Sequence, residues 1–429
     1  MLMSALTVSG QEVWTVERCM EYAVEHNHGV HMQKLALEKS LADRTQAVSA
    51  FFPSASAGMN GQYNFGRAID PETNTYTDVS TFYNGYSVQT SLPVFDGFSR
   101  LHALRAAKAS VLMGRASLRV QQDQTALSVL QAFTDVAYYE GLLRMTGERV
   151  EEATLLLKQT HVLEEVGRKS AVDVAQMESQ EAEACYEHTR QKGLYESALL
   201  ELKKTMGYPL DDSLSLETSP KVELFHSQHV DLLFDSNRSP ELQEACYQMQ
   251  ARKHEWRQAR ASLFPFLSLS AGLNTTYYKQ LHSKTATSYS DQFKNNMGEY
   301  VGATLSIPLF NRLQTITNIR KAKNNYIMAC EAYEQKQLEL EKLSREAWYD
   351  WQGFLKQSVQ MEKKVEADSL TFQLTRRQFE EGLSTAIDLR TTSAQLLNSR
   401  ATLLQCRLMT MVKAQLVRYY KGEQIWTEK

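Results

Sequence analysis

The sequence SLPVFDGFSRLHALRAAKASVL at residues 91–112 returns as SIPLFNRLQTITNIRKAKNNYI at residues 306–327, 215 positions further along the chain. The turn EVGRKSAVDVAQ at 165–176 returns at the same offset as EEGLSTAIDLRT. Upstream, FFPSASAGMNGQY at 51–63 corresponds to LFPFLSLSAGLNTTYY at 263–278. This period is far longer than the roughly 20 to 50 residues of solenoid repeats. We therefore interpret the chain as one domain-sized unit that has been duplicated once.

Composition narrows the classes of function that the chain can have. A formal net charge of −3 provides no excess of cations for nucleic acid, and no such partner is predicted. No stretch approaches the about 18 consecutive apolar residues of a transmembrane helix, so any membrane span would be made of strands. The sequence lacks a phosphate-binding loop, a nucleophile elbow and the zinc-binding HExxH motif, so we predict neither an enzyme nor a cofactor.

The cysteines and histidines give little support to a metal site. The five cysteines are scattered singly, and we predict small core residues rather than disulfides or metal ligands: Cys19, Cys185, Cys246, Cys330 and Cys406. His26, His28 and His31 cluster near the first expected helix, whereas His226 and His229 lie in a linker. No cysteine or carboxylate stands at a matching spacing, so we interpret these histidines as solvated residues rather than metal ligands.

The first ten residues, MLMSALTVSG, are apolar and end in a small residue, which predicts a signal-peptide remnant over residues 1–10. The basic residues that normally open a signal peptide are missing, so a disordered tail is the alternative. The duplication is unaffected by this choice, because both copies lie downstream of residue 10.

Two segments without proline, residues 94–208 and 309–429, permit very long helices. We expect a long helix over 97–166 and its copy over 312–381, each about 70 residues and about 105 Å long. In the second helix, apolar residues recur every seven positions, which predicts coiled-coil packing. These residues are Ile319, Tyr326, Tyr333, Leu340, Ala347, Phe354 and Met361.

Helices of about half that length are expected at 16–50, at 171–206 and, in the second copy, at 386–421. Two of them stacked end to end match one long helix, as the wall of a helical cylinder requires. The first repeat then occupies 11–206 and the second 239–429, with a linker at 207–238.

Each copy contains one expected β-hairpin, at about 54–94 and about 266–309. Apolar residues alternate with small polar residues along the strands, which predicts a sheet with one apolar and one polar face. Each strand has about the 9 to 11 residues that a tilted membrane strand needs, or slightly more. Aromatic residues flank both ends, as in the girdles of an outer-membrane barrel. A soluble pair of hairpins with aromatic ends is the alternative.

Four strands are too few to close a barrel, and an open sheet edge in hydrocarbon leaves backbone groups unpaired at several kcal/mol each. The chain must therefore oligomerise if it enters a membrane. Two copies would supply eight strands, whose interior is filled by side chains, and three would supply twelve. The small polar residues of the predicted inner face leave the interior open, which favours three copies.

The duplicated SLPVF and SIPLF segments and the duplicated G-x-x-[ST]-x-x-D turn resemble those of TolC-like outer-membrane efflux proteins, the outer membrane factor family. The resemblance covers the chain from about residue 12 onwards. It implies a mixed α and β fold: a homotrimeric, 12-stranded transmembrane β-barrel with four strands per chain, continued by a long α-helical coiled-coil barrel. It also implies the outer membrane of a Gram-negative bacterium, with the helices in the periplasm and the 207–238 linker in a belt around the tunnel.

The resemblance assigns three groups of residues. The periplasmic tip, where an adaptor docks, comprises Gly167, Arg168, Lys169, Ser170, Gly382, Leu383, Ser384 and Thr385. The periplasmic gate comprises Asp388 and, in the first copy, Asp173. The strand-to-helix hinges comprise Pro93, Phe95 and Asp96, and then Pro308, Phe310 and Asn311, with Asp96 and Asn311 capping the long helices.

The two aspartates also have an interpretation that rests on their spacing alone. Each stands three positions after a hydroxyl residue, Ser170 or Thr385, which is the spacing of a capping box at a helix start. The gate interpretation instead predicts a ring of carboxylates, one from each subunit, that attracts cations.

The second tip, Gly382-Leu383-Ser384-Thr385, is close to the family's usual pattern, whereas the first tip departs from it. Arg168 and Lys169 replace an apolar residue in the first copy, and we expect them to form salt bridges with neighbouring aspartates. A well-studied member of the family has an arginine four residues before the position of Asp388 and a further aspartate three residues after it. Here Ser384 and Thr391 stand at those positions, so that gating network cannot be carried over intact. Asp388 is therefore the strongest gate candidate.

The predicted function is a passive trimeric exit duct of a tripartite efflux or type I secretion system. The resemblance implies three kinds of partner: a periplasmic adaptor (membrane fusion) protein, an inner-membrane RND or ABC transporter, and outer-membrane lipid. The alternative is a soluble coiled-coil scaffold whose hairpins mediate contacts and which conducts nothing.

Overall fold

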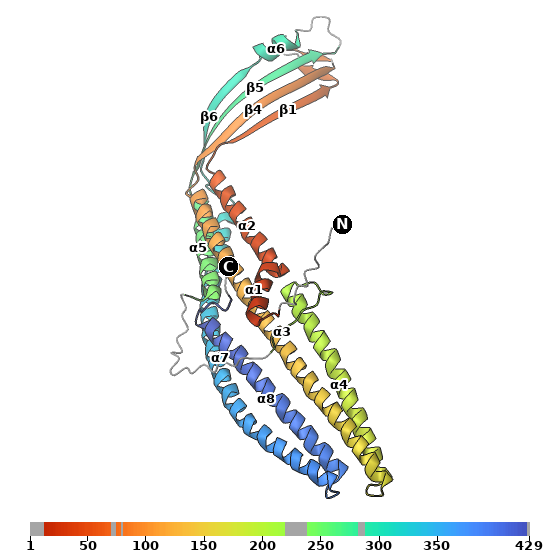
Figure 1. The fold of residues 1–429 in the computed structure, drawn as a ribbon. Helices are drawn as coiled ribbons and strands as arrows, with labels where there is room; N and C mark the ends of the chain where they lie inside the picture. Colours follow the sequence, from red (N-terminus) through yellow and green to blue (C-terminus); the bar gives the residue numbers. More distant parts are fainter. Residues whose placement is uncertain (1–12, 70–73, 79, 219–237, 282–287, 427–429) are drawn as a thin grey trace, which may run out of the picture. The chain divides into compact units, whose positions relative to one another are not determined.

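The computed structural model describes residues 13–69, 74–78, 80–218, 238–281 and 288–426, which are coloured in Figure 1. The predicted signal-peptide remnant and the linker histidines His226 and His229 lie outside the described residues. The chain divides into two compact units. The first comprises Met1–Leu37, Gly114–Glu244 and Glu334–Lys429, and the second comprises Glu38–Met113 and Ala245–Tyr333.

The helices and strands follow the internal repeat. The helices are α1 Val16–His26, α2 His28–Ser49, α3 Ser99–Glu165, α4 Ala171–Met206, α5 Pro240–Ala261, α6 Tyr289–Asn295, α7 Gln314–Glu380 and α8 Ala386–Tyr420. The strands are β1 Ser54–Asn64, β2 Arg67–Ile69, β3 Tyr76–Asp78, β4 Thr81–Phe95, β5 Phe266–Gln280 and β6 Gly298–Ser306. Among the described helices, none is both long and apolar enough to cross a membrane. The long helices α3 and α7 both have 67 residues and start 215 positions apart, so the duplication extends to the lengths of the elements.

The segment expected as one helix over 16–50 is two helices, because the chain turns at Asn27. This residue has an extended backbone with ψ 131°, and its side-chain Nδ2 donates to the Thr205 carbonyl at 2.8 Å. Its Oδ1 accepts from the Gly29 backbone N–H at 2.7 Å, which satisfies an amide at the start of α2. The expectation of one continuous helix was wrong because a side chain caps the second helix and ties it to the end of α4.

The core of the first unit forms where α1 packs against α3 and α4. Met20 of α1, Phe133 of α3 and Leu202 of α4 are buried together there. Burying side chains of this size stabilises the fold by about 1.5–3 kcal/mol each. Trp426 closes the cluster near the C-terminus, and its Nε1 donates to the buried Asp123 carboxylate at 2.8 Å. The C-terminal segment is therefore part of this core.

The cysteines follow expectation only in part. All five are free thiols, and Cys19 and Cys406 are buried as predicted. Burial raises the pKa of the Cys19 thiol to about 12, so this group stays protonated. Cys185 is exposed on α4, so the prediction of a core residue is wrong at that position.

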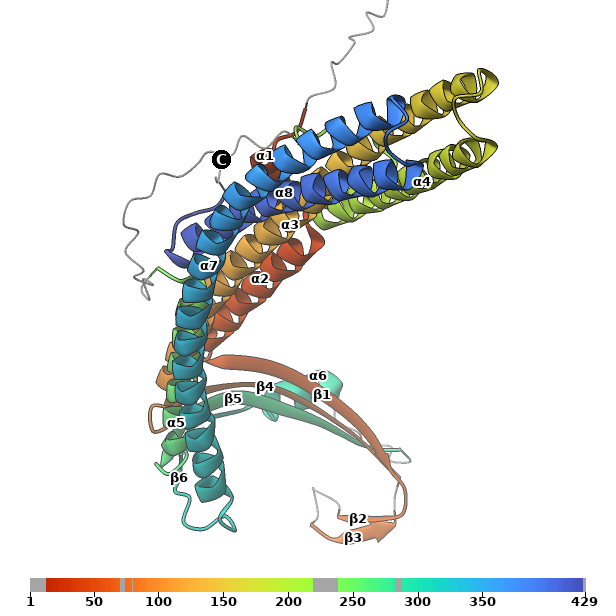
Figure 2. The ribbon, with the colours of Figure 1, turned by 90° about the horizontal axis from the view of Figure 1, so that it is seen from below.

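The predicted seven-residue seam of α7 is buried at Leu340 and Ala347, and the same spacing leads to the buried Asp368. A second row at this spacing contains Phe372 and Phe379. The two rows fit the a and d positions of a coiled coil. Phe372 and Phe379 pack against Leu389 and Leu396 of α8, which lies beside α7 in Figure 2.

The main sheet of the second unit has the strand order β1-β4-β5-β6, with neighbouring strands antiparallel (Figure 1). Residues directly opposite each other share a face of the sheet. A small polar row across all four strands consists of Ser54, Ser91, Ser270 and Gly302. An apolar row on the opposite face consists of Leu92, Leu269 and Ala303. The predicted division into a polar and an apolar face is therefore confirmed.

The connections within the hairpins contain structure that the sequence patterns did not predict. β2 and β3 pair as a small separate sheet. α6 lies on the apolar face of the main sheet, where Thr275 donates from Oγ1 to the Phe293 carbonyl at 2.7 Å. The Tyr289 hydroxyl also donates to the Tyr86 hydroxyl at 2.8 Å. Part of the apolar face is thus covered by the chain itself.

β1 and β6 form the two edges of the main sheet within one chain. Among the described residues, the outer side of each edge strand faces no further strand. An uncovered edge offers backbone donors and acceptors to another chain. The sheet is therefore built to be continued by other copies.

Candidate functional site

Each long helix ends at a glycine with a left-handed backbone. Gly167 after α3 has φ 73°, and Gly382 after α7 has φ 80°. The Arg168 backbone N–H then donates to the Leu163 carbonyl at 2.7 Å, and the equivalent bond from Leu383 to Gln378 is also 2.7 Å. This is the Schellman pattern, which satisfies the last carbonyls of a helix. We call residues 167–170 the first tip and residues 382–385 the second tip.

A capping box follows each tip, as the spacing predicted. The Ser170 backbone N–H donates to Asp173 Oδ2 at 3.0 Å, and the Asp173 N–H donates to Ser170 Oγ at 3.3 Å. In the second copy the corresponding distances between Thr385 and Asp388 are both 3.2 Å. The capping role of both aspartates is confirmed.

Hydrogen bonding lowers the pKa of both capping carboxyl groups. For Asp173 the main cause is the Ser170 backbone N–H, and for Asp388 it is the Thr385 hydroxyl. Donors to a carboxylate stabilise its charged form. Both side chains therefore carry a negative charge at neutral and mildly acidic pH.

Lys169 of the first tip contacts an aromatic ring instead of an aspartate. Its Nζ lies 3.8 Å from the centroid of the buried Phe379 ring of α7. Neither Arg168 nor Lys169 forms an ion pair within the described residues, so the predicted salt bridges are not found in this chain. A cation over a ring face is attracted by the ring quadrupole, so Lys169 connects the first tip to the second copy.

Two ion pairs connect the copies further from the tips. Arg376 of α7 lies 3.1 Å from Glu152 of α3, and Arg400 of α8 lies 3.3 Å from Glu148. Partners in the first pair are 224 residues apart in sequence, so no local pattern could have predicted the contact. Each pair is partly exposed and stabilises by no more than about 1 kcal/mol.

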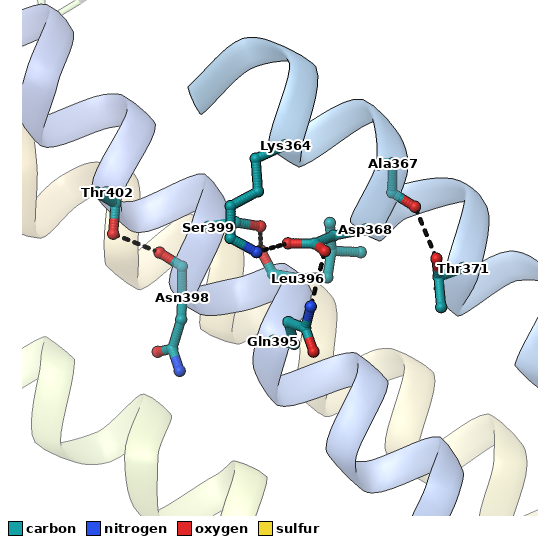
Figure 3. A network of polar contacts seen from close by, with 9 residues as sticks. All are labelled: Lys364, Ala367, Asp368, Thr371, Gln395, Leu396, Asn398, Ser399 and Thr402. Atoms are coloured by element: carbon teal, nitrogen blue, oxygen red, sulfur yellow. Dashed lines mark hydrogen bonds and ion pairs between the residues drawn. The ribbon is translucent and has the colours of Figure 1, made fainter. Parts of the chain in front are cut away.

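A polar network interrupts the apolar seam between α7 and α8 (Figure 3). Lys364 donates from Nζ to the buried Asp368 carboxylate at 2.6 Å, and Gln395 donates from Nε2 to its other oxygen at 2.8 Å. The Lys364 hydrogen bond is the main cause that lowers the pKa of Asp368. A satisfied polar group at a coiled-coil seam fixes the register of the two helices.

A cavity of about 650 Å³ adjoins this network. Its lining includes Arg149 of α3, Glu183 of α4, Lys364 of α7 and Arg390 of α8. Helices α3, α4, α7 and α8 therefore all contribute polar residues to the lining of this space.

Both strand-to-helix junctions contain two consecutive residues with positive φ. They are Gly97 at 65° and Phe98 at 70°, then Arg312 at 56° and Leu313 at 64°. This backbone costs an L-residue about 1–2 kcal/mol. The predicted hinge residues Pro93, Phe95, Pro308 and Phe310 lie just before these positions. The unusual backbone itself was missed, because only the glycine among the four residues signals it.

Asp96 and Asn311 of the two hinges each accept a hydrogen bond from the first turn of the helix that follows. Asp96 Oδ2 accepts from the Arg100 backbone N–H at 3.0 Å and from its Nε at 2.9 Å. Asn311 Oδ1 accepts from the Thr315 backbone N–H at 3.4 Å. The first junction therefore has the stronger cap, because it adds a charged hydrogen bond.

Among the described residues, no group of three His, Cys, Asp or Glu side chains is placed to hold a metal ion. His26 instead stacks on Tyr22 with ring centroids 4.0 Å apart. Its Nδ1 lies 3.0 Å from the Tyr22 carbonyl oxygen. Both of these contacts of the His26 side chain are therefore made within its own helix, α1.

The two-copy organisation agrees with a known protein family. The chain matches the family described as outer membrane efflux protein over residues 20–208 and 236–416. It belongs to this family. Outer membrane efflux proteins are channels of the outer membrane with a helical barrel in the periplasm, and that location applies to this chain.

Individual relatives are distant in sequence and close in fold. The chain is 21% identical over 386 residues to the outer membrane protein TolC of Escherichia coli strain K12, covering 86% of this chain and 76% of TolC. It superposes on the solved structure of CusC with a TM-score of 0.83 at 16% identity, covering 97% and 96% of the two chains. For the Campylobacter jejuni CmeC outer membrane channel, the TM-score is 0.81 at 15% identity, with 96% and 87% covered.

These comparisons confirm the predicted fold class, a mixed α and β chain that contributes four strands to a trimeric barrel. The predicted function of an outer-membrane efflux channel is confirmed as well. They give no support to the alternative of a soluble scaffold. The functional roles that the resemblance assigns to the tips and the hinges remain predictions.

Proposed function

We propose that this efflux protein works as a passive exit duct whose two tips form its gate and its adaptor-docking end. The observation that supports this most is the repeated tip, a capped carboxylate at the far end of a 67-residue helix in each copy. Such a helix is about 100 Å long, which is long enough to extend a conduit deep into the periplasm. The tips, at the periplasmic end of the conduit, would then control whether it is open or closed.

Three copies would complete the conduit. The edges β1 and β6 of one chain pair with those of its neighbours, which gives twelve strands and a closed barrel. Closure satisfies every backbone group that would otherwise face hydrocarbon. The homotrimer also brings three first tips and three second tips together around one axis.

The gate follows from charge and from contacts between the copies. Three copies of Asp388 would form a ring of carboxylates whose pKa is already lowered by the cap. Such a ring attracts cations and holds them at the constriction. The contacts of Lys169 with Phe379 and of Arg376 with Glu152 keep the two hairpins of each chain together. Opening must break these contacts.

The tips also suit a protein partner. Val166, Val172, Leu383 and Ile387 are large apolar residues that lie exposed on or beside the two tips. Exposed apolar groups within a polar surface mark sites of protein contact. We therefore assign this end to a periplasmic membrane fusion protein, which couples the duct to an inner-membrane RND or ABC transporter.

Single-channel recording in planar bilayers distinguishes a gating role of Asp388 from its capping role. Asp388→Asn removes the charge and keeps a polar group at the cap, whereas Thr385→Ala removes the capping hydroxyl and keeps the charge. We expect Asp388→Asn to weaken block by a trivalent cation about ten-fold and Thr385→Ala to leave the block in place. Equal block in the wild type and both variants would leave capping as the only role of Asp388.

A further inference from the structure

Charge is distributed very unevenly between the parts of the chain. The second unit contains four helical segments at the ends of the strands, residues 38–49, 96–113, 245–261 and 311–333, which we call the basic collar. The basic collar holds 13 Lys and Arg against 5 Asp and Glu, a formal charge of +8, whereas the whole chain carries −3. The positive charge is thus concentrated next to the sheet.

Within the part of the chain that the structure describes, most of these cations form no ion pair, although Arg100 and Arg252 do. Arg105, Lys108, Arg257, Arg320, Lys321 and Lys323 form no ion pair with any described residue, and all of them except Arg257 are exposed. Some cations of the first unit, among them Arg376, Arg400 and Lys413, do pair with a carboxylate. The free cations of the basic collar remain available for an external anion.

The charge also changes the chemistry of two half-buried imidazoles in the basic collar. His102 and His254 stack with ring centroids 6.0 Å apart. Burial, and then Arg105 and Arg257, lower the pKa of both rings. The histidines are therefore neutral at pH 7, and the lysines and arginines carry the charge.

The basic collar lies at a defined distance from the sheet. α3 starts at Ser99 and α7 at Gln314, so Lys108 and Lys323 are each nine residues into their helices, about 14 Å along the axis. The polar headgroup layer of a bilayer is about 5–7 Å thick on each side. With a Debye length of about 8 Å, these charges are within electrostatic reach of headgroups at the strand ends.

An aromatic rim separates the basic collar from the strands. Phe52, Phe98 and Phe264 are exposed at three of the four junctions between helices and strands. Aromatic rings followed by cations are typical of the boundary between hydrocarbon and water. Aromatic rings followed by cations are not required along a lumen that carries cargo.

We propose that the basic collar binds anionic phospholipid headgroups of the leaflet that faces the periplasm. Each cation near such a surface strengthens the attraction, and the three collars of a trimer act together. The bound lipid would hold the barrel at a fixed depth in the membrane. This inference rests on the location in the outer membrane and is independent of how the tips work.

Native mass spectrometry of the intact trimer tests the proposal. The full chain is reconstituted in nanodiscs of phosphatidylcholine with one-fifth phosphatidylglycerol, and the lipids that remain bound after release are counted. The test variant carries Arg320→Gln, Lys321→Gln and Lys323→Gln. The control carries Lys356→Gln, Lys363→Gln and Arg377→Gln, three exposed cations of the same helix that are also unpaired in the described structure.

We expect wild type and control trimers to retain phosphatidylglycerol several-fold above its share of the nanodisc, and the collar variant to retain it near that share. Equal retention of the two lipids by the wild type would overturn the proposal, as would equal loss in the control. A collar variant that keeps its lipids but shifts the anion-to-cation permeability of the channel would also overturn it, because the cations would then face the lumen.

Discussion

The two strand-to-helix junctions have nearly the same sequence and backbone, but they lie in different surroundings. The first junction follows β4, a central strand, and Gly97 is buried there against Ala261 and Phe264. The second follows the edge strand β6, and its Phe310 is 79% exposed. Gly97 of the first junction is therefore packed within the chain, whereas Phe310 of the second junction is exposed. Duplication has therefore produced two copies of one turn that differ in how far their residues are buried within the chain.

The largest difference between the two junctions is expected when alanine is introduced at equivalent positions, 97 and 312. In Gly97→Ala, the new Cβ would stand 2.6 Å from the Ala261 carbonyl oxygen, in a backbone with φ 65°. We expect a loss of about 2–5 kcal/mol in stability from overpacking and backbone strain. Arg312→Ala should change stability by no more than about 0.5 kcal/mol, since that position already has a Cβ. Thermal unfolding in detergent, followed by circular dichroism, measures both, and similar losses would refute the contrast.

The next prediction concerns the second junction, where Phe310 is exposed. Phe310→Ala should weaken the trimer by about 1–2 kcal/mol per interface, because a ring exposed in one chain is covered by the next. Its counterpart Phe95→Ala should lower the stability of the subunit itself, since Phe95 packs on Phe98 with ring centroids 5.7 Å apart. The temperature at which trimers dissociate on SDS gels reports the first effect. A Phe310→Ala trimer as heat-resistant as the wild type would show that the ring is not part of an interface.

The tips extend the comparison to the other end of the helices. Lys169 of the first tip contacts Phe379, while its counterpart Ser384 lies 3.4 Å from Asp388 Oδ2. Lys169→Met should remove a contact of about 0.5–1 kcal/mol between the hairpins and raise the open fraction about two- to five-fold. Arg168→Met is the matched control, because Arg168 contacts no ring in the described structure. Single-channel open times that respond equally to both variants would argue against a specific contact.

Lowering the pH is expected to produce the smallest difference between the two tips. The pKa of Asp173 and of Asp388 is lowered in the folded chain, so each carboxylate stabilises its cap above the ordinary pKa of about 3.8 and loses that effect as pH falls through the lowered value. Hydrogen exchange at the two tips should therefore stay equally protected from pH 7 to pH 5, after correction for the intrinsic rate. Loss of protection at one tip within this range would show that the two caps are not equivalent.

Features that depend on neighbouring residues could be predicted from the sequence, and features that depend on distant ones could not. The capping boxes at Ser170 and Thr385 were predictable because their partners are three residues away. The break at Asn27 was not, since it depends on a hydrogen bond to Thr205. The contact of Lys169 with Phe379 joins the two copies and has no local signature.

In the strands, too, local features were predictable and features that depend on distant residues were not. Alternation of apolar and small polar residues predicted the two faces of the sheet, because side chains alternate along every strand. The short helix α6 was missed, as it is held by tertiary hydrogen bonds such as the one from Thr275 to Phe293. The gate and the docking role of the tips remain predictions, which channel recordings of the tip variants decide.

The open edges of the main sheet have a genetic consequence. A proline within β1, as in Ala57→Pro, cannot donate to the ladder of a closed ring, so one faulty copy disables the two sound copies that join it. In a cell that makes equal amounts of both versions, random assembly leaves only about one-eighth of the rings fully sound. A variant whose faulty subunit still joins the trimer is then dominant over the wild-type gene, because each pore contains three subunits.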